Sequence, residues 1–80
     1  MSVESKVAAI VARAANVAAK DIRPEMRLSE LGMDSLEKIE CVLALEEVFH
    51  VEIADEDLWR IRSVQDAIDL VIRAVAVERH

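Results

Sequence analysis

Turn-forming and aromatic residues are scarce in this chain of 80 residues. It has one glycine, one proline, one phenylalanine, one tryptophan and no tyrosine. Because tight hairpin turns commonly rely on glycine, this scarcity favours helices over a β-sheet. The shortage of aromatic side chains leaves alanine, valine, leucine and isoleucine to build the interior. We therefore expect an all-α fold with an aliphatic core.

Cysteine is nearly absent as well. The single cysteine, Cys41, cannot form an internal disulfide, which agrees with a reducing cytoplasm. Cys41 and two distant histidines, His50 and His80, offer no spacing for a metal site. A Ser–His–Asp hydrolase site is also disfavoured, because the residues between Ser35 and His50 suit a helix of about four turns, which would separate the two by more than about 20 Å.

Long apolar runs and an excess of positive charge are the remaining absences. No apolar run reaches the roughly 20 residues of a bilayer span, and residues 1–6 lack the features of a signal peptide. Sixteen acidic residues against ten basic ones give a net charge of −6, which disfavours nucleic-acid binding. The length suits one domain, residues 1–80, with little room for an enzyme pocket. We expect a cytoplasmic, monomeric, non-catalytic protein whose partners present basic surfaces.

Apolar residues spaced three and four apart predict helices over residues 3–17 and 36–49. Ser2 is a suitable N-cap for the first of them. Between the two helices the periodicity fails and Pro24 interrupts the chain, which predicts a long loop over residues 18–34. The apolar residues expected to pin this loop to the core are Ile22, Met26, Leu28 and Leu31.

Two further helices are predicted in the second half of the chain. A short third helix is expected to follow a cap at Asp55 or Asp57. The fourth is expected to open at a capping box formed by Ser63 and Asp66. The third helix is expected to end near Ile61. The fourth is expected to fray at residues 78–80.

The helix predicted over residues 36–49 carries two apolar stripes when successive residues are advanced by about 100°. The first stripe is expected to face the core and consists of Cys41, Val42, Leu45, Val48 and Phe49. The second lies on another side and consists of Leu36, Ile39 and Leu43, with Glu40, Glu46 and Glu47 beside it. We interpret the second stripe as a docking surface for basic partner proteins. The alternatives are that neighbouring helices cover this stripe and that the acids form a solvated face.

The start of this helix is a candidate site. Gly32 frees the backbone for a turn, and Asp34 and Ser35 are both favoured N-caps. The N–H groups of a first helical turn and the helix dipole favour negative charge. The Ser35 hydroxyl is therefore placed to carry or meet a phosphate. The alternative is that Ser35 only caps the helix.

The residues around Ser35 also carry a resemblance to a known family. Residues 31–36, Leu-Gly-Met-Asp-Ser-Leu, resemble the L-G-x-D-S-L signature of acyl carrier proteins. The likeness continues along most of the chain, at Glu40 and in residues 44–49, 51–57 and 63–68. It implies a four-helix bundle of acyl-carrier type with a long loop between the first two helices and a short third helix.

The resemblance implies that a phosphopantetheinyl transferase joins 4′-phosphopantetheine from coenzyme A to Ser35 Oγ. The thiol of this group then holds acyl intermediates as thioesters for acyl synthases, ligases or transferases, with fatty acid synthesis as the default pathway. Asp34 is expected to orient the transferase or its metal ion, and simple capping is the alternative. The family shields acyl chains in an apolar cleft, whose lining we expect from periodicity to be Val42, Leu45, Phe49, Ile53 and Ile61.

Some positions depart from the family pattern. His50 and Ala54 stand where glycine and proline are common, so His50 must either adopt a left-handed conformation or extend the helix. The other departures are Val48, in place of an acid, and the bulky or basic Trp59, Arg60 and Arg62. These departures leave open a specialised carrier for polyketide, aminoacyl or other acyl groups. A separate alternative, of a different class, is an unmodified acidic helical interaction module in which Ser35 only caps the helix.

Overall fold

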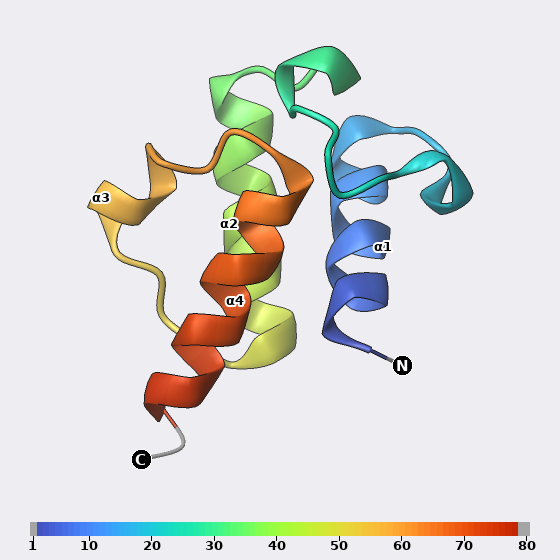
Figure 1. Cartoon of the computed structure of the whole chain (residues 1–80). Coiled ribbons are helices and arrows are strands. Elements are labelled where there is room, and N and C mark those ends of the chain that lie inside the picture. The colour runs from blue at the N-terminus through green and yellow to red at the C-terminus, as the bar shows by residue number, and fades with distance from the viewer. Residues whose placement is uncertain (1, 79–80) are drawn as a thin grey trace.

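Four α-helices and two short 3-10 helices form the part of the chain that the computed structural model describes, residues 2–78 (Figure 1). The α-helices are α1 (Val3–Ala15), α2 (Ser35–Phe49), α3 (Asp55–Leu58) and α4 (Val64–Glu78). The 3-10 helices, η1 (Ala19–Asp21) and η2 (Ser29–Leu31), lie in the long segment between α1 and α2. Strands are absent from these residues, where only an isolated bridge joins Arg27 and Ser63. The predicted all-α arrangement, with its long loop and short third helix, is confirmed.

An aliphatic core lies where α1 packs against both α2 and α4. Leu45, Val7, Val11 and Val71 have no more than traces of exposed surface. The core continues through the first residues of α4 and the loop before it, which contribute Ile61, Val64, Ala67 and Ile68. None of the helices of residues 2–78 is both long and apolar enough to cross a membrane.

Two helices end in left-handed residues other than glycine. α1 ends at Ala15, two residues before the predicted end, and its C-cap is Asn16 (φ 60°), which agrees with the tolerance of asparagine for this conformation. His50 (φ 55°, ψ 48°) ends α2, and its N–H donates to the carbonyl of Glu46. His50 therefore adopts the geometry that glycine usually provides and does not extend the helix.

The third and fourth helices differ in how they begin. No side chain caps α3, which starts after Ala54 and ends at Leu58, so the predicted Asp55 or Asp57 cap and the predicted end at Ile61 are wrong. Ala54 is extended, and its own carbonyl accepts from the helix, so the acids fall inside the first turn.

The capping box of α4 is confirmed. Ser63 Oγ accepts from the Asp66 N–H at 3.1 Å, and Asp66 Oδ2 accepts from the Ser63 N–H at 3.1 Å. Glu78 remains helical, and the rest of the predicted fraying, at residues 79–80, lies outside the described residues.

Backbone hydrogen bonds tie the long loop to the start of α4. The N–H of Leu28 donates to the carbonyl of Arg62, and the N–H of Val64 donates to the carbonyl of Met26, both at 2.9 Å. Leu28 is buried, and the other predicted pins of the loop, Ile22, Met26 and Leu31, pack partly buried against the core. The loop therefore holds Arg27 beside the start of α4, at the end of the bundle where α2 also begins (Figure 1).

Candidate functional site: the start of α2 and its pocket

At the start of α2, the residue that caps the helix and the candidate serine are two different residues. Asp34 is the N-cap: its Oδ1 accepts from the Glu37 N–H at 2.8 Å, and Glu37 Oε1 accepts from the Asp34 N–H at 3.1 Å. Ser35 is the first helical residue and is exposed. Of the two caps that the sequence offered, the structure therefore uses Asp34 and leaves the Ser35 side chain accessible.

Gly32 sets the turn that leads into this site. It ends η2 with a left-handed backbone (φ 78°), and its N–H donates to the carbonyl of Ser29. A Cβ at Gly32 would meet no atom within 4 Å, so the positive φ rather than lack of space is what favours glycine here. The turn presents Asp34 and Ser35 at the end of the bundle.

The donors at this helix start fit a phosphate group. The capping box occupies the N–H groups of Asp34 and Glu37. The N–H groups of Ser35 and Leu36 belong to the first turn of α2, where an N–H has no intrahelical acceptor, and they lie at the positive end of the helix dipole. A phosphate ester of the Ser35 hydroxyl would lie next to these donors, which is a favourable setting for an anion.

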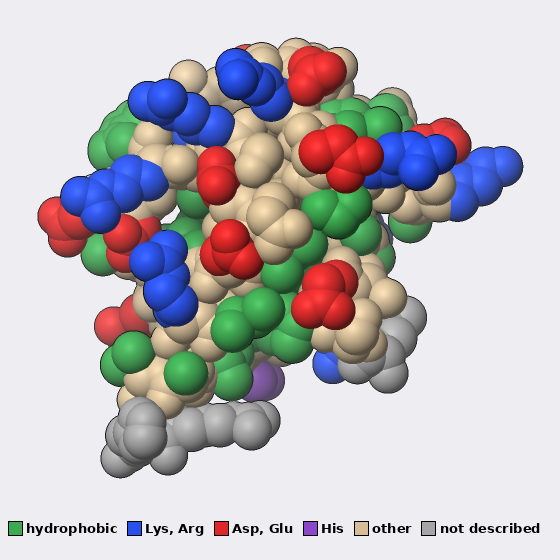
Figure 2. Space-filling view, viewed as in Figure 1, with side chains coloured by type: hydrophobic (Ala, Val, Ile, Leu, Met, Phe, Trp, Pro, Cys, Tyr) green, Lys and Arg blue, Asp and Glu red, His purple; other side chains and the backbone are tan. Residues whose placement is uncertain are grey.

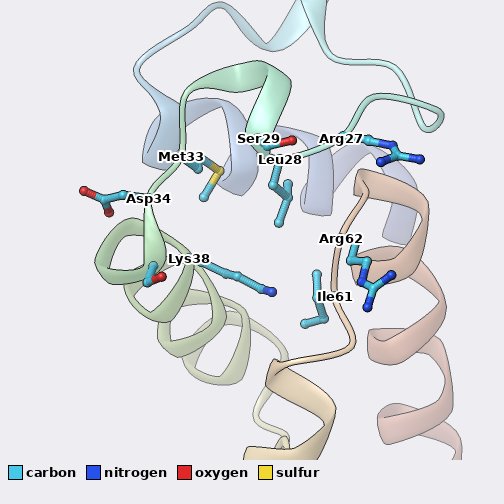
Figure 3. Close-up of a pocket in the computed structure, with 9 residues that line it drawn as sticks. Arg27, Leu28, Ser29, Met33, Asp34, Lys38, Ile61 and Arg62 are labelled. Atoms are coloured by element: carbon cyan, nitrogen blue, oxygen red, sulfur yellow. The ribbon is translucent and has the colours of Figure 1, made fainter.

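A pocket with a cavity volume of about 240 Å³ lies beside Ser35. Leu28, Met33 and Ile61 provide its apolar surface (Figure 3). Its charged lining consists of Arg27, Lys38, Arg62 and Asp34, and Ser29 adds a hydroxyl. The residues come from the loop, from the start of α2 and from the segment before α4, which the backbone hydrogen bonds described above hold together.

Sequence reasoning missed the basic part of this pocket. Lys38 falls near the core stripe of α2 in the sequence pattern, and in the structure it is half-buried and extends toward Ile61 across the pocket (Figure 3). Arg62 had been noted only as a departure in the third-helix region. One signal was present: Lys38 follows Ser35 by three residues, so a helix places them on the same face.

Two pKa values reflect this arrangement. Burial, and then the positive charge of Arg62, lower the pKa of Lys38, while Asp66 acts in the opposite direction. The hydrogen bond from the Arg62 backbone N–H is the largest cause and lowers the pKa of Asp66; burial, the next largest, raises this pKa, and hydrogen bonds from Ser63 lower it further. The pocket therefore brings positive charges close enough to repel one another.

The second stripe of α2 is largely open. Leu36 is 65 % exposed and Leu43 is 57 % exposed, and Glu40 and Glu47 are exposed beside them. Ile39 is half-buried. Neighbouring helices therefore leave most of this stripe uncovered.

Glu46 is different from the other acids of that stripe. It is half-buried, and its Oε2 accepts from the Ile53 N–H at 2.9 Å. This bond spans seven residues and fastens the segment between α2 and α3. Glu46 therefore has a structural contact that Glu40 and Glu47 lack among the described residues.

The residues predicted to line an acyl cleft lie in or against the core. Val42, Leu45 and Ile61 are buried, and Phe49 and Ile53 are partly buried and pack against them. Ile61 alone of these five also lines the pocket beside Ser35. The pocket therefore meets the core at Ile61.

The core stripe of α2 was predicted correctly at Cys41, Val42 and Leu45 but not at Val48. Burial raises the pKa of the Cys41 thiol to about 11. Val48 is 50 % exposed because it lies at the edge of the stripe in the last turn of α2. It lines a shallow depression with Val3 and His50.

Comparison with known proteins decides the family. The phosphopantetheine attachment site family matches residues 5–71 of this chain. The chain belongs to the acyl carrier protein family. Acyl carrier proteins from two strains of Nitratidesulfovibrio vulgaris, DP4 and Hildenborough, are each 47 % identical to it over 72 residues, which cover 89 % of this chain and 95 % of theirs.

Solved acyl carrier protein structures share the fold. The crystal structure of an acyl carrier protein from Thermotoga maritima superposes with a TM-score of 0.78 at 32 % identity, covering 89 % of this chain and 84 % of that one. A solution structure of a hexanoyl acyl carrier protein from the actinorhodin polyketide synthase of Streptomyces coelicolor has a TM-score of 0.76 at 22 % identity. It covers 88 % of this chain and 86 % of that one, so it supports the fold alone. The predicted acyl-carrier type of the bundle is confirmed.

Membership of the acyl carrier protein family fixes the general chemistry. Its prosthetic group is 4′-phosphopantetheine, and its members act as carriers rather than catalysts, in contact with transferases and synthases. The donors at the start of α2 fit that group. The predicted family, cofactor and carrier function are thus confirmed.

Proposed function

We propose that Ser35 is the residue of this chain that carries 4′-phosphopantetheine. The observation that supports this most directly is the division of roles at the start of α2. Asp34 takes the cap, and the Ser35 hydroxyl stands exposed beside helix N–H groups. The group supplies a flexible arm with a terminal thiol that holds an acyl group as a thioester. Residues 1–80 act as one monomeric carrier domain around this serine.

The chain itself prepares Ser35 for modification but does not activate it. An unactivated serine hydroxyl is a weak nucleophile and needs an adjacent base. Asp34 is the nearest acid in sequence, and its Oδ1 is already engaged with the Glu37 N–H. The transferase must therefore supply the base. Asp34 fixes the helix start and presents its second carboxylate oxygen to that enzyme or to the enzyme's metal ion.

The open stripe of α2 serves as the partner surface in this proposal. Leu36, Ile39 and Leu43 would contact apolar residues of the transferase and of acyl synthases or ligases, while Glu40 and Glu47 face their basic patches. Glu46 contributes charge from the edge of this surface. Such charge pairs affect association rate and salt dependence more than the fold. The cytoplasm is the proposed location, since the only cysteine is a free, buried thiol.

Fatty acid synthesis is the default pathway for this carrier. A specialised acyl pathway is the second candidate. The observation that favours it is the basic lining of the pocket beside Ser35, formed by Arg27, Lys38 and Arg62.

Intact-mass measurement tests the proposal. Unmodified protein is incubated with coenzyme A and a broad-specificity phosphopantetheinyl transferase. The mass should rise by one phosphopantetheine group in the unsubstituted chain and stay constant in Ser35→Ala. Ser29→Ala is the matched control, because Ser29 is an exposed serine that lines the same pocket, and it should be modified normally. An unchanged mass in the unsubstituted chain would leave only an acidic helical interaction module.

A further inference from the structure

The pocket beside Ser35 is basic although the chain as a whole is acidic. Three cationic side chains, Arg27, Lys38 and Arg62, line it together with a single carboxylate, Asp34. On the face of the molecule seen in Figure 2, lysine and arginine side chains gather at the upper left, over and above α3, with acidic side chains among them. A local excess of positive charge in a chain of net charge −6 indicates a specific local role.

The nearby acids are committed to backbone groups. Asp34 Oδ1 accepts from the Glu37 N–H, and the Asp34 side chain points away from the pocket in Figure 3. Asp66 Oδ2 accepts from the N–H groups of Arg62 and Ser63 at 3.0 and 3.1 Å. The single ion pair within residues 2–78 joins Arg60 to Asp57. The three cations of the pocket therefore have no salt-bridge partner among the described residues.

The floor of the pocket is apolar and its size is small. Leu28 and Ile61 are 5 % and 2 % exposed, and Lys38 extends across the floor toward Ile61 (Figure 3). The cavity volume of about 240 Å³ is below the range of about 300–1,000 Å³ of ordinary ligand sites. A short group with an apolar stem and an anionic end fits this lining.

A neutral acyl chain fits this pocket less well than one that ends in an anionic group. Lys38 lines the pocket and extends toward Ile61 (Figure 3), so a chain that lay on Ile61 would contact the Lys38 side chain. Covering a charged group with hydrocarbon is unfavourable unless the charge gains a partner. A carboxylate supplies that partner, and hydrogen bonds between charged groups are stronger than those between neutral ones.

We propose that this pocket is an anion subsite that holds the free carboxylate of a short dicarboxylic acyl group carried on Ser35. Lys38 and Arg62 contact the carboxylate, Arg27 adds positive charge at the rim, and Leu28 and Ile61 contact the methylenes. This inference rests on the proposed function, because the acyl group arrives on the arm attached to Ser35. It names the class of cargo that the basic lining selects.

The test compares two acyl groups of equal length. The broad-specificity transferase loads unmodified protein with the succinyl or the butyryl group, using the matching acyl-coenzyme A. The two forms differ only in a terminal carboxylate. In ¹H–¹⁵N spectra, the succinyl form should shift the amide signals of Arg27, Lys38 and Arg62, and it should melt at a higher temperature than the butyryl form.

Substitutions then locate the effect. Lys38→Gln and Arg62→Gln should each remove most of the difference between the two forms, and Lys38→Arg should retain it. Lys20→Gln is the matched control, since Lys20 is exposed on η1 and does not line the pocket. Helical circular dichroism checks that each variant is folded. Equal spectra at the three residues in both forms would overturn the proposal.

Two further measurements separate this inference from other outcomes. If the arm with a free thiol already produces the shifts, the anion is the phosphodiester of the arm and the acyl assignment is wrong. Noncovalent titration of unmodified protein with S-succinyl and S-butyryl N-acetylcysteamine does not depend on Ser35 modification. We expect about fivefold tighter binding of the succinyl compound, the effect of one charged contact near the surface. If unmodified protein binds the succinyl compound no more tightly than the butyryl compound, the subsite proposal fails. This result does not depend on whether Ser35 is the modified residue.

Discussion

Two leucines of α2, two residues apart, have opposite surroundings. Leu45 is fully buried in the core, whereas Leu43 is 57 % exposed. The residue type is the same, so composition does not explain the difference. The direction in which the helix points each side chain decides it. One side of α2 packs into the core of the bundle. The other side leaves the second stripe exposed beside acidic residues, and an exposed apolar surface of this kind is typical of a binding site.

Truncating each leucine should give the largest effect and the sharpest contrast. Leu45→Ala removes a fully buried side chain and should lower the free energy of unfolding by about 2–5 kcal/mol. Leu43→Ala should change it by less than about 0.5 kcal/mol. Urea or thermal unfolding followed by circular dichroism measures both. Equal losses would mean that the exposed stripe also stabilises the fold.

The thiol of Cys41 tests the buried side in another way. Burial raises its pKa from 9.0 to about 11. A thiol whose folded pKa is raised contributes stability below pH 9, and this contribution is lost as the pH rises from 9 toward 11. At pH 8 the folded protein should hold about 100-fold less thiolate than the unfolded chain. Alkylation of unmodified protein by iodoacetamide should therefore be slow in buffer and fast in urea.

Glu46 and Glu47 provide a smaller contrast at the edge between the two sides. Glu46→Ala removes the acceptor of the Ile53 N–H and should lower the free energy of unfolding by about 1 kcal/mol. Glu47→Ala, on the exposed side, should have almost no effect. Glu46→Gln keeps an acceptor oxygen and should recover most of the loss. If all three variants unfold alike, the bond contributes nothing measurable.

Features that depend on nearby residues could be predicted from the sequence. The capping box of α4 needs only Ser63 and Asp66 three positions apart, and the buried stripe of α2 follows from the helical period. Ambiguity remained where two residues offered the same chemistry, as Asp34 and Ser35 did at the start of α2. Val48 was assigned wrongly because periodicity gives the angle of a side chain but not the extent of the neighbouring helices.

Features that depend on residues distant in the sequence could not be predicted. The bonds between Leu28 and Arg62 and between Met26 and Val64 join the loop to the start of α4, although the bonded residues lie far apart in the sequence. These bonds bring Arg27 and Arg62 to the pocket that Lys38 enters. The attachment serine was found from a local signature, whereas its basic surroundings exist only in the folded chain.

Charge reversal on the exposed side should have the smallest effect on stability and a clear effect on binding. Glu40 and Glu47 are exposed, and neither makes an ion pair among the described residues. Glu40→Lys and Glu47→Lys together should leave the free energy of unfolding nearly unchanged, because exposed charge pairs are worth at most about 1 kcal/mol. The same double variant should weaken binding to the phosphopantetheinyl transferase about tenfold at low salt, and less at high salt, where such charges are screened. Glu4→Lys and Asp69→Lys together, at exposed acids on α1 and α4 rather than α2, supply a control of equal charge change. If this control weakens transferase binding as much as the double variant does, net charge rather than the exposed side of α2 governs the association.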